Sequence, residues 1–245
     1  MIKKSKIILV FMSLFLMAVF FYRYSPRKIE YLGHYNKVYA HRVNSIEKLK
    51  SALHFFNGVE LDLVYKKDKN ILDVNHPPAQ SINLNFETYV NEIEQGTFPF
   101  LWLDIKNLDL NSAQDIFIKL NIILERLNYP KDKILIETFY PEALSIFSKA
   151  GYNTSYYLPP QLYKSTNLEN EIKNIKAVLK EQPNMGISTN FEDYDILKAN
   201  FPNRKKYIWA LVPNLNSKYN EIRKILKDEK VEIVLSNYKA FSGNR

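Results

Sequence analysis

Ionisable side chains stand at the ends of apolar, strand-like segments in the first half of the chain. His41 and Arg42 end one such segment, and His76 ends another immediately before Pro77 and Pro78. An imidazole titrates near neutral pH and can accept or donate a proton, and a guanidinium binds anions. If the fold brings these ends together, the set suits an anionic substrate. A single histidine at a strand end, however, is more often structural than catalytic.

Three carboxylates and one lysine occupy alternate positions on two further segments. Glu60 and Asp62 are two residues apart, as are Asp104 and Lys106. Residues two apart on a strand point to the same side, and carboxylates on one face repel one another unless a cation joins them. Because Mg²⁺ and Ca²⁺ prefer oxygen ligands, we predict that the three carboxylates bind one of these ions. The alternative is local neutralisation by lysines such as Lys106.

Eight apolar segments indicate strands, and segments of helical periodicity separate them. The expected strands are 37–41, 58–65, 100–106, 133–139, 152–158, 184–190, 206–212 and 231–237. Helical spacing is clearest in 45–56, 85–95, 112–127, 141–150 and 217–228. Ser45, Asn85 and Pro141 are residue types that begin helices. A strand-like piece at 70–76 predicts an added hairpin after the second strand. This alternation predicts an α/β fold, a (β/α)8 TIM barrel.

A barrel makes the strand ends informative, because active sites of this fold lie where the carboxyl ends of the strands converge. Glu137, near the end of the fourth strand, joins the candidate residues there. An open doubly wound sheet is the structural alternative, but no glycine-rich loop follows the first strand. We interpret His34 and His54 as structural, because one precedes the first strand and the other lies in a predicted amphipathic helix.

The basic charge of the chain is concentrated at its N-terminus. The formal net charge is +8, but six of the 34 basic residues precede the first acidic residue, Glu30. The remaining 28 basic and 26 acidic residues leave about +2, so we expect no nucleic-acid partner. The absence of cysteine excludes disulfides and a lipid-modified cysteine.

An uncharged apolar run at residues 7–22, with basic residues on both sides, predicts a membrane-targeting segment. We expect residues 1–28 to form an uncleaved signal anchor or transmembrane segment, because small residues suited to cleavage do not follow the run. Residues 29–245 would then form one barrel domain, exported to the periplasmic or extracellular face. If the segment is cleaved, the domain is secreted.

Four motifs, in order, carry a family resemblance: AHRVNS at 40–45, GVELDLVY at 58–65, VNHPP at 74–78 and LWLDIKN at 101–107. Together they resemble the menorin family. More distantly they resemble the glycerophosphodiester phosphodiesterases, to whose Glu-Ser-Phe element IETF at 136–139 is similar. Both families belong to the phospholipase-C-like phosphodiesterase barrels. The chain departs from the phosphodiesterases at Val43, where they have glycine, and at 44–45, where Asn-Ser replaces their later Glu-Asn pair.

The resemblance implies a metal-dependent phosphodiester hydrolase. His41 and His76 would supply the base and the acid, and the implied metal ligands are the three carboxylates already singled out. The residues implied to bind the phosphodiester substrate are Arg42, Lys106, Asn44 and Glu137. Substrates consistent with the resemblance are phospholipid head groups, glycerophosphodiesters and polymeric cell-envelope phosphodiesters.

A different class of function stays open. Menorin relatives are not firmly tied to catalysis, so the chain could be a membrane-tethered, non-catalytic binding domain for a phosphate- or sugar-containing ligand. A decayed site would usually have lost a histidine or a metal ligand, whereas both histidines and all three carboxylates are present. This completeness favours the enzyme.

Overall fold

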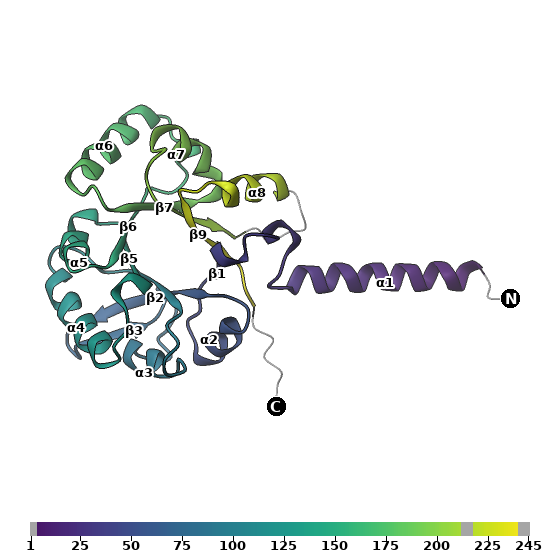
Figure 1. Cartoon of the computed structure of the whole chain (residues 1–245), viewed down its shortest axis with the longest axis horizontal. Helices are drawn as coiled ribbons and strands as arrows, with labels where there is room; N and C mark the ends of the chain where they lie inside the picture. Colours follow the sequence, from purple (N-terminus) through teal and green to yellow (C-terminus); the bar gives the residue numbers. More distant parts are fainter. Residues whose placement is uncertain (1–3, 212–217, 240–245) are drawn as a thin grey trace.

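The computed structural model describes residues 4–211 and 218–239, whose strands form a closed barrel (Figure 1). Eight described strands are parallel neighbours in the order β1-β2-β4-β5-β6-β7-β8-β9, and β9 pairs with β1 to close the ring. They are β1 (Val38–Ala40), β2 (Gly58–Lys66), β4 (Phe100–Ile105), β5 (Ile134–Thr138), β6 (Asn153–Tyr157), β7 (Gly186–Asn190), β8 (Lys206–Ala210) and β9 (Val231–Ser236). Each differs from its predicted segment by at most two residues at either end, and the predicted TIM barrel is confirmed.

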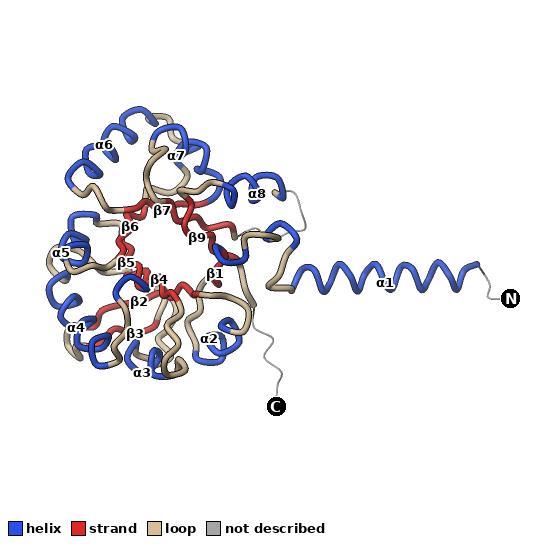
Figure 2. Tube along the Cα trace, in the orientation of Figure 1, coloured by secondary structure: helices blue, strands red, loops and turns tan. Residues whose placement is uncertain are grey.

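Helices surround the ring of strands (Figure 2). They are α2 (Ile46–Leu53), α3 (Phe86–Asn91), α4 (Ala113–Arg126), α5 (Ser145–Lys149), α6 (Leu168–Glu181), α7 (Tyr194–Asn200) and α8 (Tyr219–Lys227). The predicted helix starts are confirmed: Ser45 accepts a hydrogen bond from the Lys48 amide, and Asn85 accepts one from the Thr88 amide. Pro141 begins a 3-10 turn, η4 (Pro141–Leu144), that leads into α5.

The predicted hairpin is also present, because β2 continues past the barrel and pairs there with β3 (Ile71–Val74). The pairing is antiparallel and joins Leu63 to Val74 and Lys66 to Ile71. His76 follows β3 by two residues, so the hairpin carries this imidazole back to the mouth of the barrel, the end at which the parallel strands finish.

Two apolar cores hold the strands in place. The larger lies between strands and helices, and the smaller fills the barrel with Trp102, Leu135, Tyr207, Ile233 and Leu235. A Cβ at Gly58 would lie 2.6 Å from the Phe100 carbonyl oxygen and 2.7 Å from the Tyr39 ring, so this position must be glycine for the interior to close. Because apolar side chains fill the interior of the barrel, polar and charged candidate residues can gather only at its mouth.

The N-terminal helix α1 (Lys4–Tyr24) projects away from the barrel (Figure 1). Several of its apolar side chains are exposed, among them Phe11 and Phe15. Within residues 4–211 and 218–239, no helix meets the length and apolarity of a membrane span. The anchor that we expected at residues 7–22 is therefore without structural support and stays a prediction.

Candidate active site

Strand register brings three carboxylates to neighbouring positions at the mouth. Asp62 on β2 is the partner of Asp104 on β4, which is in turn the partner of Glu137 on β5. Partners in a parallel sheet point to the same side, so all three face the barrel interior. Glu60, two residues before Asp62, faces inward one step deeper.

The three predicted metal ligands form a compact acidic cluster, called here the acidic triad: Glu60, Asp62 and Asp104. One carboxylate oxygen of each lies within 4.8 Å of those of the other two, and all three residues are buried. Burial, followed by the charges of Asp62 and Asp104, raises the pKa of Glu60 well above its usual value. The triad therefore needs positive charge to stay fully ionised.

Lysine supplies part of that charge. The Nζ atom of Lys106 lies 2.7 Å from Oδ1 of Asp62 and also donates to Oδ2 of Asp104. Burial alone would lower the pKa of Lys106, but the two carboxylates raise it above its ordinary value. The local Lys106–Asp104 ion pair considered from the sequence is thus present, and it extends to Asp62.

One ammonium cannot neutralise three carboxylates, and the donor set of the triad fits a hard divalent ion. Its ligand atoms are oxygens, and their separations of up to 4.8 Å suit a shared ion at roughly 2.0–2.6 Å from each. Asn44 steadies one ligand, because its Nδ2 donates to Oδ2 of Asp62 at 2.7 Å. The triad could therefore hold a metal ion.

His41 lies against the triad from the end of β1. Its Nε2 is 3.7 Å from Oε2 of Glu60, and only 16% of the side chain is exposed. Burial, followed by the charge of Arg42, lowers the pKa of His41 to about 3. The imidazole is therefore neutral over the physiological range.

A tight turn after His41 sets the position of Arg42. Arg42 has a φ of +50°, a left-handed conformation uncommon for a residue with a side chain. Its amide donates to Oε2 of Glu60 at 2.5 Å, and Lys48 Nζ donates to the carbonyls of His41 and Arg42 at 2.9 and 2.8 Å. These hydrogen bonds stabilise the left-handed turn. One of them joins the backbone of Arg42 to Glu60, so the position of Arg42 depends on a predicted metal ligand. The sequence pattern did not single out Lys48 for this role.

His76 reaches the same place from the hairpin. Its Nε2 lies 2.7 Å from Nη2 of Arg42 and 3.9 Å from Oδ1 of Asp62. The Nε atom of Arg42 is itself 3.9 Å from Oδ2 of Asp62. The two histidines, which are 35 positions apart, thus contact different carboxylates of one triad.

Glu137 occupies a different environment from the other candidates. It is fully buried, and its two oxygens accept hydrogen bonds from Trp102 Nε1, at 2.9 Å, and from the Ser188 hydroxyl. Burial, followed by the charge of Asp104, raises its pKa. Because the Glu137 side chain is fully buried and already bonded to two protein donors, its direct contact with a substrate stays a prediction. The sequence pattern did not reveal Trp102 and Ser188 as its partners.

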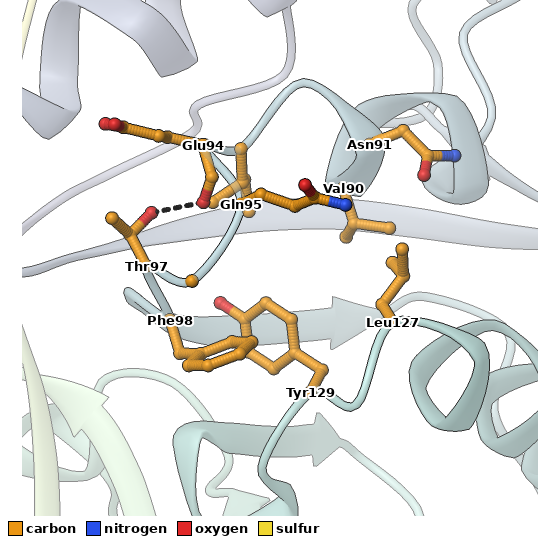
Figure 3. Close-up of a pocket in the computed structure, with 10 residues that line it drawn as sticks. Val90, Asn91, Glu94, Gln95, Thr97, Phe98, Leu127 and Tyr129 are labelled. Carbon is orange, nitrogen blue, oxygen red and sulfur yellow. Dashed lines mark hydrogen bonds between the residues drawn. The ribbon is translucent and has the colours of Figure 1, made fainter.

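A separate cavity of about 330 Å³ lies away from the triad (Figure 3). Its lining comes from residues 90–98, which precede β4, and from Leu127 and Tyr129, which precede β5. These segments enter the strands at the end of the barrel opposite the mouth, where TIM barrels carry stability rather than catalysis. The candidate active site is therefore the triad with its surrounding side chains, and not this cavity.

Solved structures support the fold independently. A glycerophosphodiester phosphodiesterase from Parabacteroides distasonis aligns with a TM-score of 0.59 at 18% identity, over 84% of this chain and 94% of that one. One from Thermotoga maritima aligns with a TM-score of 0.56 at 15% identity, over 83% and 95%. A phosphodiesterase from Oleispira antarctica in complex with the product sn-glycerol-3-phosphate aligns with a TM-score of 0.55 at 15% identity, over 82% and 93%.

No family model and no curated protein matches the chain. Membership of the menorin family, which the motifs suggested, is therefore not shown. At these identities the structural neighbours establish the barrel, and the chemistry of this chain must be argued from its own residues.

Proposed function

We propose that the chain is a metal-dependent phosphodiester hydrolase acting on a glycerophosphodiester or a related lipid-derived or cell-envelope phosphodiester. One observation supports it above all: two imidazoles from separate segments contact different carboxylates of one buried triad, beside Arg42 and Lys106. The alignment with phosphodiesterases, one of them bound to sn-glycerol-3-phosphate, agrees with this chemistry.

The cationic side chains would bind the phosphate. Arg42 is half exposed at the mouth and presents a planar set of donors to an anion. Lys106 would add a point charge from the wall of the barrel. A divalent ion on the triad would supply electrophilic assistance to phosphorus and charge neutralisation when bound.

The histidines would divide the proton transfers between them. His41, which lies against Glu60 at the mouth of the barrel, would accept the proton of the attacking hydroxyl at a ring nitrogen. Phosphate binding would draw Arg42 away from His76 Nε2 and leave this atom free to carry a proton. This nitrogen, which lies 3.9 Å from Oδ1 of Asp62, would then donate its proton to the leaving alcohol oxygen.

The test is hydrolysis of a panel of phosphodiesters with Mg²⁺, with Ca²⁺ and with a chelator. His41→Ala and His76→Ala should each lower turnover by roughly 10²–10⁴-fold, the usual span for a general acid or base. His54→Ala, at the exposed end of α2, is the matched control and should leave turnover unchanged. A binding-only protein would show no turnover in any form, and the same two variants would weaken ligand affinity instead.

We also propose that α1 anchors the chain to a membrane, with the barrel exported to the periplasmic or extracellular face. The exposed apolar side chains of α1 and the basic residues flanking the 7–22 run support this. Membrane fractionation of the full-length chain and of a chain lacking residues 1–28 tests it. Equal recovery of both in the soluble fraction would contradict the anchor.

A further inference from the structure

A row of aromatic rings runs from the barrel interior to the mouth. It consists of Trp102, Trp209, Tyr157 and Phe139, called here the aromatic row. Successive ring centroids are 6.4 Å apart for Trp102–Trp209, 4.4 Å for Trp209–Tyr157 and 3.7 Å for Tyr157–Phe139. Trp102 is fully buried, whereas Phe139 is 45% exposed. The row therefore connects the core to solvent.

The aromatic row and the triad occupy different arcs of the barrel. The acidic and basic groups come from β1, β2, β4 and the hairpin, whereas the three outer rings come from the ends of β5, β6 and β8. Register places them close together: Ser155 pairs with Glu137, and Tyr157 is the next inward position toward the mouth. Burial, followed by the charges of Glu137 and Asp104, raises the pKa of Tyr157 to about 12. Tyr157 thus lies within electrostatic reach of the charged groups at the mouth.

Core packing does not explain the outer end of the row. Phe139 leaves nearly half of its surface in water beside the candidate site, where a polar residue would cost nothing. Tyr157 is half-buried, yet its hydroxyl makes no hydrogen bond with any residue in 4–211 or 218–239. A half-buried tyrosine hydroxyl usually has a partner. Both features suit a ligand with an apolar face and hydroxyl groups.

The arrangement discriminates between ligand types. Rings packed on one another cannot surround a quaternary ammonium on several sides, and Arg42 and Lys106 are close enough to act on Tyr157 and would repel a cation. Glycerol is too small to cover the Tyr157 and Phe139 rings, and an acyl chain would make no use of the tyrosine hydroxyl. A nucleobase is separated from its phosphate by ribose, whereas Tyr157 lies close enough to Lys106 and Arg42 for their charges to act on it. A sugar or cyclitol ring esterified to the phosphate satisfies all these conditions.

We infer that the aromatic row binds a sugar or cyclitol ring carried by one alcohol of the phosphodiester substrate. The inference rests on the proposed phosphodiesterase function and specifies its substrate class. The ring would lie against Tyr157 and Phe139 through its C–H groups, and one ring hydroxyl would hydrogen bond to the Tyr157 hydroxyl. Trp209 would support Tyr157 from the barrel interior.

The experiment compares matched esters on the purified full-length chain with Mg²⁺ or Ca²⁺. Glycerophosphoinositol carries a six-membered polyol ring, and the comparison esters carry glycerol or choline; lysophosphatidylglycerol adds an acyl chain. Tyr157→Leu and Phe139→Leu should raise KM for the inositol ester about three- to tenfold, the effect of losing one aromatic contact. KM for the glycerol ester should change less than twofold.

Two further variants separate contact from folding. Tyr157→Phe keeps the ring and removes only the hydroxyl, so it should raise KM for the inositol ester by about threefold. Tyr140→Leu is the control, because Tyr140 is 49% exposed on the same segment and makes no ring contact with the aromatic row. It should leave KM for every ester unchanged.

Equal KM values for all esters in wild type and variants would overturn the inference, as would a preference for the choline or acyl ester that Phe139→Leu removes. If the wild type hydrolyses no ester, the proposed function is wrong, and calorimetry then decides about the aromatic row alone. Tighter binding of inositol 1-phosphate than of glycerol 3-phosphate, lost in Tyr157→Leu, would uphold the site. Equal or absent binding of the two phosphates would overturn it.

Discussion

The guanidinium Nη2 of Arg42 lies 2.7 Å from Nε2 of His76, although one residue leaves β1 and the other follows β3. A guanidinium has donors and no acceptor, so Nε2 of the imidazole is the acceptor in this contact. Arg42 therefore occupies the nitrogen through which His76 would exchange a proton. Substrate phosphate is a stronger hydrogen-bond acceptor for Arg42 than the imidazole is, so its binding would free Nε2 of His76.

Arg42→Ala should lower kcat/KM for a phosphodiester by roughly 10²–10³-fold, because it removes a charged donor from the developing phosphate charge. Arg42→Lys should recover only part of the loss, since an ammonium lacks the planar donor pair. Steady-state kinetics measure both. Arg126→Ala is the control, because Arg126 pairs with Glu87 on the outside of the barrel. Near-normal kcat/KM in Arg42→Ala would remove Arg42 from the site.

Glu60→Gln should abolish stabilisation by divalent ions. An ion at about 100 times its Kd stabilises the folded state by roughly 2.7 kcal/mol, or about 5–10 °C in Tm for a domain of this size. Without an ion, Glu60→Gln should instead unfold at a higher temperature than wild type at neutral pH, because glutamine is neutral and avoids the cost of protonating Glu60 on folding. Thermal unfolding with Mg²⁺, with Ca²⁺ and with a chelator measures both effects.

The pH dependence of this stabilisation has a defined sign. The folded-state pKa of Glu60 is raised, so ion-free folded protein holds a proton there that unfolded protein has released, and stability falls as pH rises above about 4.5. An ion removes this penalty, so its Tm gain should be larger at pH 8 than at pH 5. Glu94→Gln, in the cavity at the opposite end, is the control and should retain the full gain. An equal gain in Glu60→Gln and wild type would mean that Glu60 is not a ligand.

The sequence predicts the barrel and most of the site because both depend on local patterns. Alternation on β2 and β4 is enough to put Glu60, Asp62 and Asp104 on one face, and the barrel then brings the faces together. The contact between Arg42 and His76 could not be predicted in this way. It depends on the left-handed turn at Arg42 and on how far the hairpin folds back, which are properties of the assembled chain.

The aromatic row was hidden for a related reason. Tyr157 and Trp209 lie in segments that the sequence predicts to be strands. In such a segment an aromatic residue that contacts a ligand cannot be distinguished from one that packs in the core. Only the exposed fraction of Phe139 and the ring distances distinguish the row from the interior. The two hydrogen bonds that Glu137 accepts, from Trp102 and Ser188, likewise depend on the assembled fold. Ser188, for example, is 51 residues away from Glu137 in the sequence.

Glu137→Gln should destabilise the fold and leave substrate binding nearly intact. The amide can accept from only one of the two donors, Trp102 or Ser188, and leaves the other without its buried partner. We expect a loss of about 1–3 kcal/mol in the free energy of unfolding and a change in KM below about threefold. Denaturant unfolding and kinetics provide the two readouts, with the exposed Glu142→Gln as control. A tenfold rise in KM would restore Glu137 as a direct substrate ligand.

His41 should stay neutral from pH 5 to pH 8. Burial and the Arg42 charge lower its pKa to about 3, so its ring resonances in NMR spectra should not titrate over this range. A midpoint near 6.5, the ordinary value for histidine, would contradict the environment assigned to it.

The same shift makes His41 a source of acid sensitivity. Below pH 6.5 His41 becomes protonated in the unfolded chain but stays neutral in the folded chain. The stability contributed by the neutral ring is therefore present above pH 6.5 and is lost as the pH falls toward 3. His41→Asn removes this proton uptake, and its free energy of unfolding should fall less than that of wild type between pH 6.5 and pH 5, by up to about 2 kcal/mol. Denaturant unfolding with a chelator present, at several pH values, measures the difference, with His54→Asn as the control. Parallel pH profiles for wild type and His41→Asn would show that His41 takes up protons equally in the folded and unfolded chain, and would contradict the lowered pKa of His41.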